Sequence, residues 1–300
     1  MSILELDRFT TRDLQKWEQA SANLNELWDL LYFGVEPKRR KLRHQLIESI
    51  KGVGHVAVPL DHWVRMVTYQ YSLEPLTCAG SLQAVGGRFN AGYELDANTM
   101  RPWPALYLAQ NFETAYREKF QLGSEEGVEG LAPHELGLEG AVSHATVFVR
   151  GRLNRVFDMT AFTSLNSVAR VLSKITLPFE VATLARELKF DRNTFFMVKT
   201  GQQLFNAAVK QNWRVLPTQF GLPAPSQILA ELVRDAGYEA ILYPSSKGSG
   251  RCLAVFPANL GDDSFVQLMD EAPSEKTTKR LDQSTAAVLE GWDAIPRQFR

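Results

Sequence analysis

Short apolar runs bounded by glycine and polar residues most constrain the fold of this chain. Each run has the length of a strand that is buried on both faces. The runs are 105–109 (ALYLA), 146–149 (TVFV), 240–243 (AILY) and 252–256 (CLAVF). Helical patterns lie near 111–122, 163–174, 179–188, 200–211 and 226–236. Because strands and helices do not alternate regularly, we expect an α+β fold and not a doubly wound parallel sheet.

The first fifty residues carry a helical pattern. Apolar residues recur there at helical spacing, namely Trp17, Leu24, Leu27, Trp28 and Leu31. The sequence Gly-Val-Glu-Pro at 34–37 predicts a break before a second helix, whose apolar face carries Leu42, Leu46, Ile47 and Ile50. The basic run at 38–43 fits a solvated helix face or a contact with an acidic partner.

Composition divides the chain into three expected parts. Residues 1–75 are expected to form an N-terminal helical region, 76–261 a mixed domain, and 262–300 a polar C-terminal tail. Trp292 and Ile295 predict that this tail is partly docked. The Gly- and Glu-rich segment 123–140 is predicted to be an exposed loop.

Charge and cysteine content exclude several classes of protein. The 33 Lys and Arg nearly balance the 34 Asp and Glu, so bulk phosphate neutralisation, and hence nucleic-acid binding, is not expected. Two cysteines, Cys78 and Cys252, exclude a disulfide scaffold and a four-cysteine zinc site. The five histidines form no metal-binding pattern, so no metal site is expected.

Targeting signals are not evident in the sequence. No window approaches the roughly 18 consecutive apolar residues of a membrane span, and the N-terminus lacks the pattern of a secretory signal. We therefore expect no membrane partner. The expected location is the cytoplasm, either of the producing cell or of a target cell that the protein enters without a cleavable signal peptide.

Three short segments combine residue types that could carry chemistry. In GGRFN (86–90), two glycines allow close backbone approach, and Arg88 could bind a phosphate or a carboxylate. Tyr107 lies in an apolar run and is followed by a helix with Glu113 and Glu118. The segment YPSSKG (243–248) ends a buried strand. Taken singly, each also fits an ordinary role: a surface arginine, a paired helix carboxylate or a polar turn.

Taken together and in order, these segments resemble the RES domain family over roughly residues 80–260. The blocks are GGRFN, ALYLA, ETAYRE and GYEAILYPSS, followed by a last apolar strand. The family is named for its arginine, glutamate and serine positions. The stretch 93–104 and the region 160–215 are longer than expected for compact members, and residues 1–75 lie outside the recognisable core.

The resemblance assigns the arginine to Arg88 and the tyrosine to Tyr107. It assigns the glutamate to Glu118, with Glu113 as the second candidate. The serine after the proline matches Ser245, with Ser246 as the second candidate, and Asn90 is a further candidate for substrate binding.

The resemblance implies an ADP-ribosyltransferase-like core of two small facing β-sheets that grip NAD, flanked by helices. It implies a toxin that cleaves the nicotinamide–ribose bond of NAD, as a glycohydrolase or a phosphorylase. NAD would be the substrate, no cofactor would be needed, and an antitoxin or immunity protein would be the partner. Alternatives are ADP-ribosyl transfer to a protein and a catalytically silent binding module.

The same resemblance suggests a role for each residue. Glu118 would stabilise the positive charge that develops on the ribose. Arg88 would bind the diphosphate, and Tyr107 would pack against nicotinamide. Ser245 would bind the ribose or hold Glu118.

Overall fold

The apolar runs are strands of a central sheet in the computed structural model, which describes residues 11–96, 98–122, 143–189 and 197–291. β4 (Leu106–Ala109), β6 (Ala240–Pro244) and β7 (Arg251–Val255) lie where the apolar runs predicted them. β1 (Val56–Thr68) and β5 (His144–Asp158) are longer than these three strands. β8 (Phe265–Leu268) and β9 (Arg280–Leu281) extend one edge, and β2 (Gly86–Gly87) and β3 (Asn90–Ala91) form a separate hairpin.

The sheet closes on itself. Its strand order is β1-β4-β7-β6-β5-β8-β9, and β1 also pairs with β5. β5 and β6 run parallel, with Phe157 opposite Ile241, and the other described pairs are antiparallel. The expected α+β fold is therefore confirmed. The ADP-ribosyltransferase-like core stays a prediction, since the described strands form one closed sheet and one hairpin.

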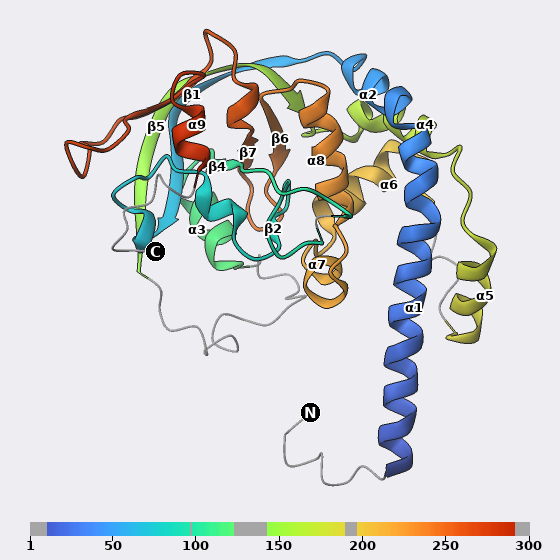
Figure 1. The fold of residues 1–300 in the computed structure, drawn as a ribbon. Coiled ribbons are helices and arrows are strands. Elements are labelled where there is room, and N and C mark those ends of the chain that lie inside the picture. Colours follow the sequence, from blue (N-terminus) through green and yellow to red (C-terminus); the bar gives the residue numbers. More distant parts are fainter. Residues whose placement is uncertain (1–10, 97, 123–142, 190–196, 292–300) are drawn as a thin grey trace.

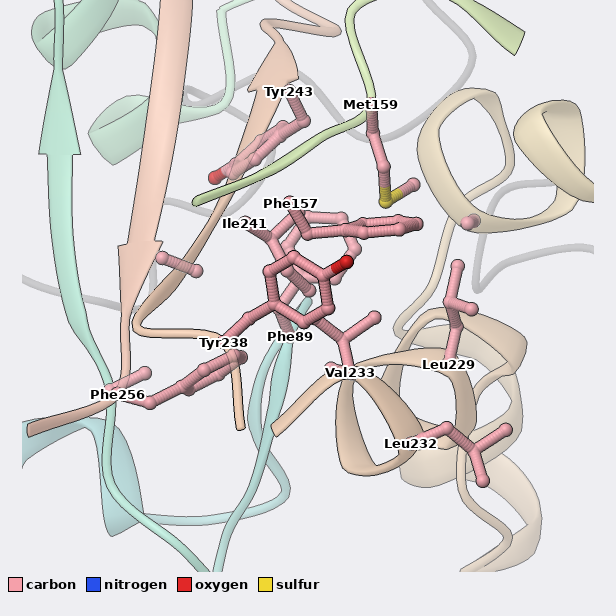
Figure 2. Packing of buried hydrophobic residues seen from close by; sticks show 14 of the residues in the cluster. Phe89, Phe157, Met159, Leu229, Leu232, Val233, Tyr238, Ile241, Tyr243 and Phe256 are labelled. Atoms are coloured by element: carbon pink, nitrogen blue, oxygen red, sulfur yellow. The ribbon is translucent and has the colours of Figure 1, made fainter. Parts of the chain in front are cut away.

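Side chains on both faces of this sheet are buried. Leu106 and Leu108 of β4 belong to one core, while Tyr107 between them packs against the other. The second core also contains Phe89 and Ile241, and Figure 2 shows these aromatic and aliphatic side chains beside α8. Burial on both faces explains why the central strands appear in the sequence as unbroken apolar runs.

Helices surround the sheet and extend away from it. They are α1 (Thr11–Lys41), α2 (Arg43–Lys51), α3 (Phe112–Phe120), α4 (Asn166–Leu172), α5 (Phe179–Glu187), α6 (Gly201–Phe205), α7 (Val215–Phe220), α8 (Pro225–Asp235) and α9 (Ala286–Glu290). A π-helical turn, η5 (Asn206–Lys210), continues α6. Figure 1 shows α1 reaching beyond the rest of the described chain, with α5 beside it. No helix in the described ranges combines the length and apolar character that a bilayer span requires.

The break predicted at 34–37 is wrong. α1 runs through Pro37 without interruption and ends at Lys41. Packing against α5 buries Leu27, and Glu36 forms a buried ion pair with Arg39 at 2.6 Å. These contacts offset the loss of the backbone hydrogen bond that the proline cannot donate.

The predicted N-terminal helical region, 1–75, differs from the structure at residues 56–68. These residues are β1, whose pairing with β5 over most of its length overrides the weak local pattern. Within the C-terminal segment 262–300, β8 and β9 join the sheet and Leu281 and Leu289 are fully buried. The predictions for 123–140, Trp17, Trp292 and Ile295 fall on positions or side chains outside the described residues.

Candidate active site

Four separate chain segments place the predicted site residues together. Arg88 lies between β2 and β3, Tyr107 on β4, and Glu118 in the last turn of α3. Ser245 and Ser246 begin the turn between β6 and β7. Hydrogen bonds join Arg88 to Ser246 and both Ser245 and Ser246 to Glu118.

Glu118 is held through one carboxylate oxygen. Its Oε1 accepts a hydrogen bond from Ser245 Oγ at 2.6 Å and another from the Ser246 backbone N–H at 3.1 Å. Asn111 precedes α3, and its side chain caps the helix by accepting from the Thr114 N–H at 2.9 Å. Within the described part of the chain, Oε2 has no hydrogen-bond donor. One oxygen therefore fixes the carboxylate and the other can accept hydrogen bonds from a ligand.

Ser245 has no hydrogen-bonding capacity left for a ligand. It donates to Glu118, and its Oγ accepts from the N–H groups of Lys247 and Gly248, each at 3.0 Å. Its exposed fraction is 6%. Of the two predicted roles, the geometry supports holding Glu118 and not binding ribose. Ser246 Oγ, which accepts from Arg88 Nη2 at 3.3 Å, still has a hydrogen to donate.

The β6–β7 turn is pressed against α3. A Cβ added at Gly250 would collide with Thr114 Oγ1. Only glycine allows this approach, which brings Ser245 within reach of the end of the helix.

Glu113, the second candidate for the glutamate, lies elsewhere on α3. Its Oε1 pairs with Arg117 Nε at 3.0 Å, and its side chain is 71% exposed. Among the described residues, it forms no hydrogen bond or ion pair with Arg88, Ser245 or Ser246, whereas Glu118 accepts hydrogen bonds from both serines. The geometry therefore favours Glu118.

Arg88 is oriented by the end of a helix. Its Nη1 donates to the carbonyl oxygens of Ala208, Val209 and Gln211 at 3.2, 2.9 and 3.2 Å. The partial negative charge of a helix C-terminus suits a guanidinium. Among the described residues, Arg88 Nε has no acceptor. Its outer edge thus remains available to an anion.

Tyr107 holds the loop that carries Arg88. Its hydroxyl donates to Asn90 Oδ1 and accepts from the Phe89 N–H, both at 2.9 Å. A Cβ at Gly87 would collide with this hydroxyl, so the loop needs glycine there. Burial raises the pKa of Tyr107 and outweighs the opposing effects of the Phe89 N–H and the Arg88 charge. The phenol therefore stays protonated and keeps donating.

The prediction that Asn90 binds substrate needs correction, because Asn90 has no exposed surface. Its Oδ1 accepts from the Gly87 N–H at 2.9 Å and from Tyr107. Its Nδ2 donates to the carbonyl oxygens of Ser81 at 2.7 Å and Trp103 at 3.1 Å. A side chain whose donors and acceptors are all used inside the protein braces the arginine loop and cannot contact a ligand.

Gln227 is a bracing residue that the sequence analysis missed. It is fully buried on α8, and its Nε2 donates to the carbonyl oxygens of Val85, Gly87 and Asn90 at 2.9, 3.1 and 3.0 Å. Its Oε1 accepts from the Ala224 N–H at 2.9 Å. The available signal was a glutamine at the third position of a helix that starts with proline, which also suits an ordinary cap.

Arg214 is a second missed residue, and it lies in the electrostatic field of the site. It is exposed at the start of α7 and sits at 4.8 Å from the ring centre of Trp213. Desolvation by the surrounding protein lowers the pKa of Arg214, the Arg88 charge lowers it further, and Glu118 opposes both. No motif signals this residue, since it belongs to the long region 160–215.

A metal centre is not formed by these residues. Within the described ranges, no group of three or more His, Cys, Asp and Glu side chains is placed to hold a metal ion. The chemical resources of the site are one carboxylate, two guanidinium groups, a serine hydroxyl and a protonated phenol.

These observations define a class of protein. Its members have an α+β fold that brings an arginine, a glutamate and a serine together from distant segments of the chain. The sequence profile of the RES domain matches residues 62–273, so the chain belongs to the RES domain family. No curated protein matches it. Among solved structures, it is similar to the crystal structure of the M. tuberculosis MbcT–MbcA toxin–antitoxin complex, with 12% identity and a TM-score of 0.40. That match covers 82% of this chain and 96% of the other.

Proposed function

We propose that this protein is a toxin that consumes NAD by cleaving the bond between ribose C1′ and the nicotinamide nitrogen. Membership in the RES domain family supports this proposal. The observation that carries it is the Glu118 carboxylate, held at 2.6 Å by Ser245 Oγ through one oxygen, with the other oxygen free of protein donors in the described chain.

The reaction suits this arrangement. Nicotinamide departs as a neutral molecule with the electrons of the broken bond, so it needs no proton. The ribose left behind becomes positively charged, and a fixed carboxylate stabilises that charge more in the transition state than in the ground state. Glu118 Oε2 would accept hydrogen bonds from the ribose hydroxyls. Water or phosphate would then attack C1′ and give ADP-ribose or its 1″-phosphate.

Arg88 would bind the diphosphate. Its orientation is fixed by the carbonyl oxygens at the end of η5, so little side-chain entropy is lost on binding. The half-buried ring of Tyr107 would pack against nicotinamide while its hydroxyl stays in the loop network. Ser246 would donate its free hydroxyl hydrogen to the ligand.

We further propose the ADP-ribosyltransferase-like arrangement, with NAD held over the part of the sheet that carries β4 and β6. Unregulated loss of NAD would damage the producing cell. We therefore propose that the protein acts in the cytoplasm and that an antitoxin or immunity protein neutralises it there.

The direct test is incubation of the purified protein with NAD, with and without phosphate, followed by chromatography and mass spectrometry. Glu118→Gln should lower turnover about 10²–10³-fold, the usual loss of one electrostatic stabiliser. Glu113→Gln is the matched control on the same helix and should retain wild-type turnover. Equal activity of Glu118→Gln and the wild type would refute the site.

The products identify the reaction. ADP-ribose indicates hydrolysis, and ADP-ribose-1″-phosphate indicates phosphorolysis. Intact NAD would refute unaided breakdown and would leave ADP-ribosyl transfer to a protein, or a silent binding module, as the alternatives.

A further inference from the structure

The segment that orients Arg88 leads directly into Arg214 along the chain. The carbonyl oxygens of Ala208, Val209 and Gln211 accept hydrogen bonds from Arg88, and Arg214 follows shortly along the chain. The intervening turn is fixed, because Trp213 is buried and Asn212 Oδ1 accepts from the Arg214 N–H at 3.2 Å. The backbone of Arg214 is therefore anchored next to the site.

The guanidinium group of Arg214 has no carboxylate partner among the described residues. Arg39, Arg43 and Arg234, by contrast, each form an ion pair with a carboxylate. The charge of Arg88 lowers the pKa of Arg214, so the two guanidinium groups repel each other, and one glutamate cannot neutralise both. Within the described part of the chain, the site thus has an excess positive charge, and each guanidinium group has an edge without an acceptor.

A ligand with two linked negative charges matches this excess. Guanidinium groups bind phosphate oxygens through paired charge-assisted hydrogen bonds. We propose that Arg214 and Arg88 together bind the diphosphate of a dinucleotide, with Arg214 as a second substrate-binding residue. This inference rests on the proposed function, which identifies the dinucleotide as NAD.

Another possible role for Arg214 is an ion pair with Glu118. The two roles predict different kinetics. A residue that binds the diphosphate affects the KM for NAD and the affinity for any nucleoside diphosphate. A residue that only orients Glu118 affects kcat and leaves nucleoside diphosphate binding unchanged.

The test measures ADP and AMP binding by calorimetry, and the KM and kcat for NAD, in wild type and Arg214→Gln. Loss of a charge-assisted hydrogen bond should weaken ADP binding and raise the KM about 10- to 100-fold, with a smaller change for AMP. Arg214→Lys should recover part of the affinity. Arg150→Gln is the matched control, because Arg150 is exposed on β5 opposite Gln267 and has no role in the site.

The outcomes separate this inference from the proposed function. Wild-type KM and ADP affinity in an active Arg214→Gln variant would overturn the inference and leave the function standing. A fall in kcat alone would also overturn it, in favour of the ion pair. ADP binding that depends on Arg214 in a protein that does not consume NAD would support the inference and refute the function. No ADP binding and no NAD consumption by the wild type would overturn both.

Discussion

Replacement of Ser245 by alanine tests whether the fixed position of Glu118 governs turnover. The substitution removes the 2.6 Å hydrogen bond to Glu118 Oε1 and leaves the Ser246 N–H as the remaining donor to that oxygen within the described chain. It also leaves the N–H groups of Lys247 and Gly248 without their acceptor. Because Ser245 has no capacity to bind a ligand, the substitution should change catalysis without weakening substrate binding.

The magnitude follows from the bonds that are lost. A hydrogen bond to a charged group contributes about 1.5–3 kcal/mol, and about 1.4 kcal/mol corresponds to a tenfold change in rate. If all of this acts in the transition state, kcat falls about 10- to 100-fold, and if half of it does, about 3- to 10-fold. The free energy of unfolding should fall by about 1–3 kcal/mol, since donors in the turn lose their partner.

The assay is steady-state NAD consumption together with denaturant unfolding of wild type, Ser245→Ala and Ser249→Ala. Ser249 lies exposed in the same turn and forms no hydrogen bond with any described residue, so its substitution should leave both quantities unchanged. The expected result for Ser245→Ala is a lower kcat with the KM within about twofold. A wild-type kcat, or a loss confined to the KM, would refute the positioning role.

Two further predictions concern the framework of the site, and a third concerns the turn that follows β9. Gln227→Met should lower the free energy of unfolding by about 2–3 kcal/mol in urea titrations and raise the KM, because three buried or partly buried carbonyl oxygens lose their donor. Unchanged stability would contradict the bracing role. Gly87→Ala should reduce NAD consumption at least tenfold, because the added methyl group collides with the Tyr107 hydroxyl. In the double variant with Tyr107→Phe, the loss of activity should be smaller than the sum of the two separate losses. Strictly additive losses would count against the collision. Hydrogen bonds from the Ser284 hydroxyl and, to a lesser extent, from Arg280 lower the pKa of Asp282 from 3.8 to about 2. The ionised carboxylate therefore stabilises the folded protein fully above about pH 4, and this stabilisation is lost as the pH falls towards 2. Asp282→Asn should remove about 1 kcal/mol at pH 7 but only a small fraction of that at pH 2, where half of the native carboxylate is protonated. Thermal unfolding across that pH range measures the difference, and equal losses at both pH values would exclude the linkage.

The sequence predicted the elements whose signals are local. The runs 105–109, 240–243 and 252–256 are strands because both faces of the closed sheet are buried, which leaves no polar alternation to confuse the pattern. α8 was equally clear, since its apolar residues form one face and Gly237 follows its end. Two of the four blocks of the family resemblance, ALYLA and GYEAILYPSS, cover β4 and β6, and the RES domain match confirms that resemblance.

Features that depend on tertiary contacts could not be predicted in this way. β1 is a strand because β5 supplies its partners, and its burial follows no regular alternation. α1 continues through Pro37 because packing and ion pairs outweigh a strong local break signal. Asn90 resembled a binding residue because it is polar and lies close to Arg88 in the sequence. Nothing in the local sequence indicates that its side chain is buried. Arg214 was missed because only the folded chain brings α7 to the site.

The order in which the chain is synthesised means that the site is completed only late in synthesis. Ser245 lies 127 residues after Glu118, so synthesis at about 5–20 residues per second separates them by roughly 6–25 s. Until the β6–β7 turn emerges from the ribosome, Glu118 lacks the donors that hold its carboxylate. If the protein consumes NAD as proposed, a nascent chain is harmless during this interval. Because α1 and α2 are synthesised first, the neutralising partner proposed above would have this interval in which to bind.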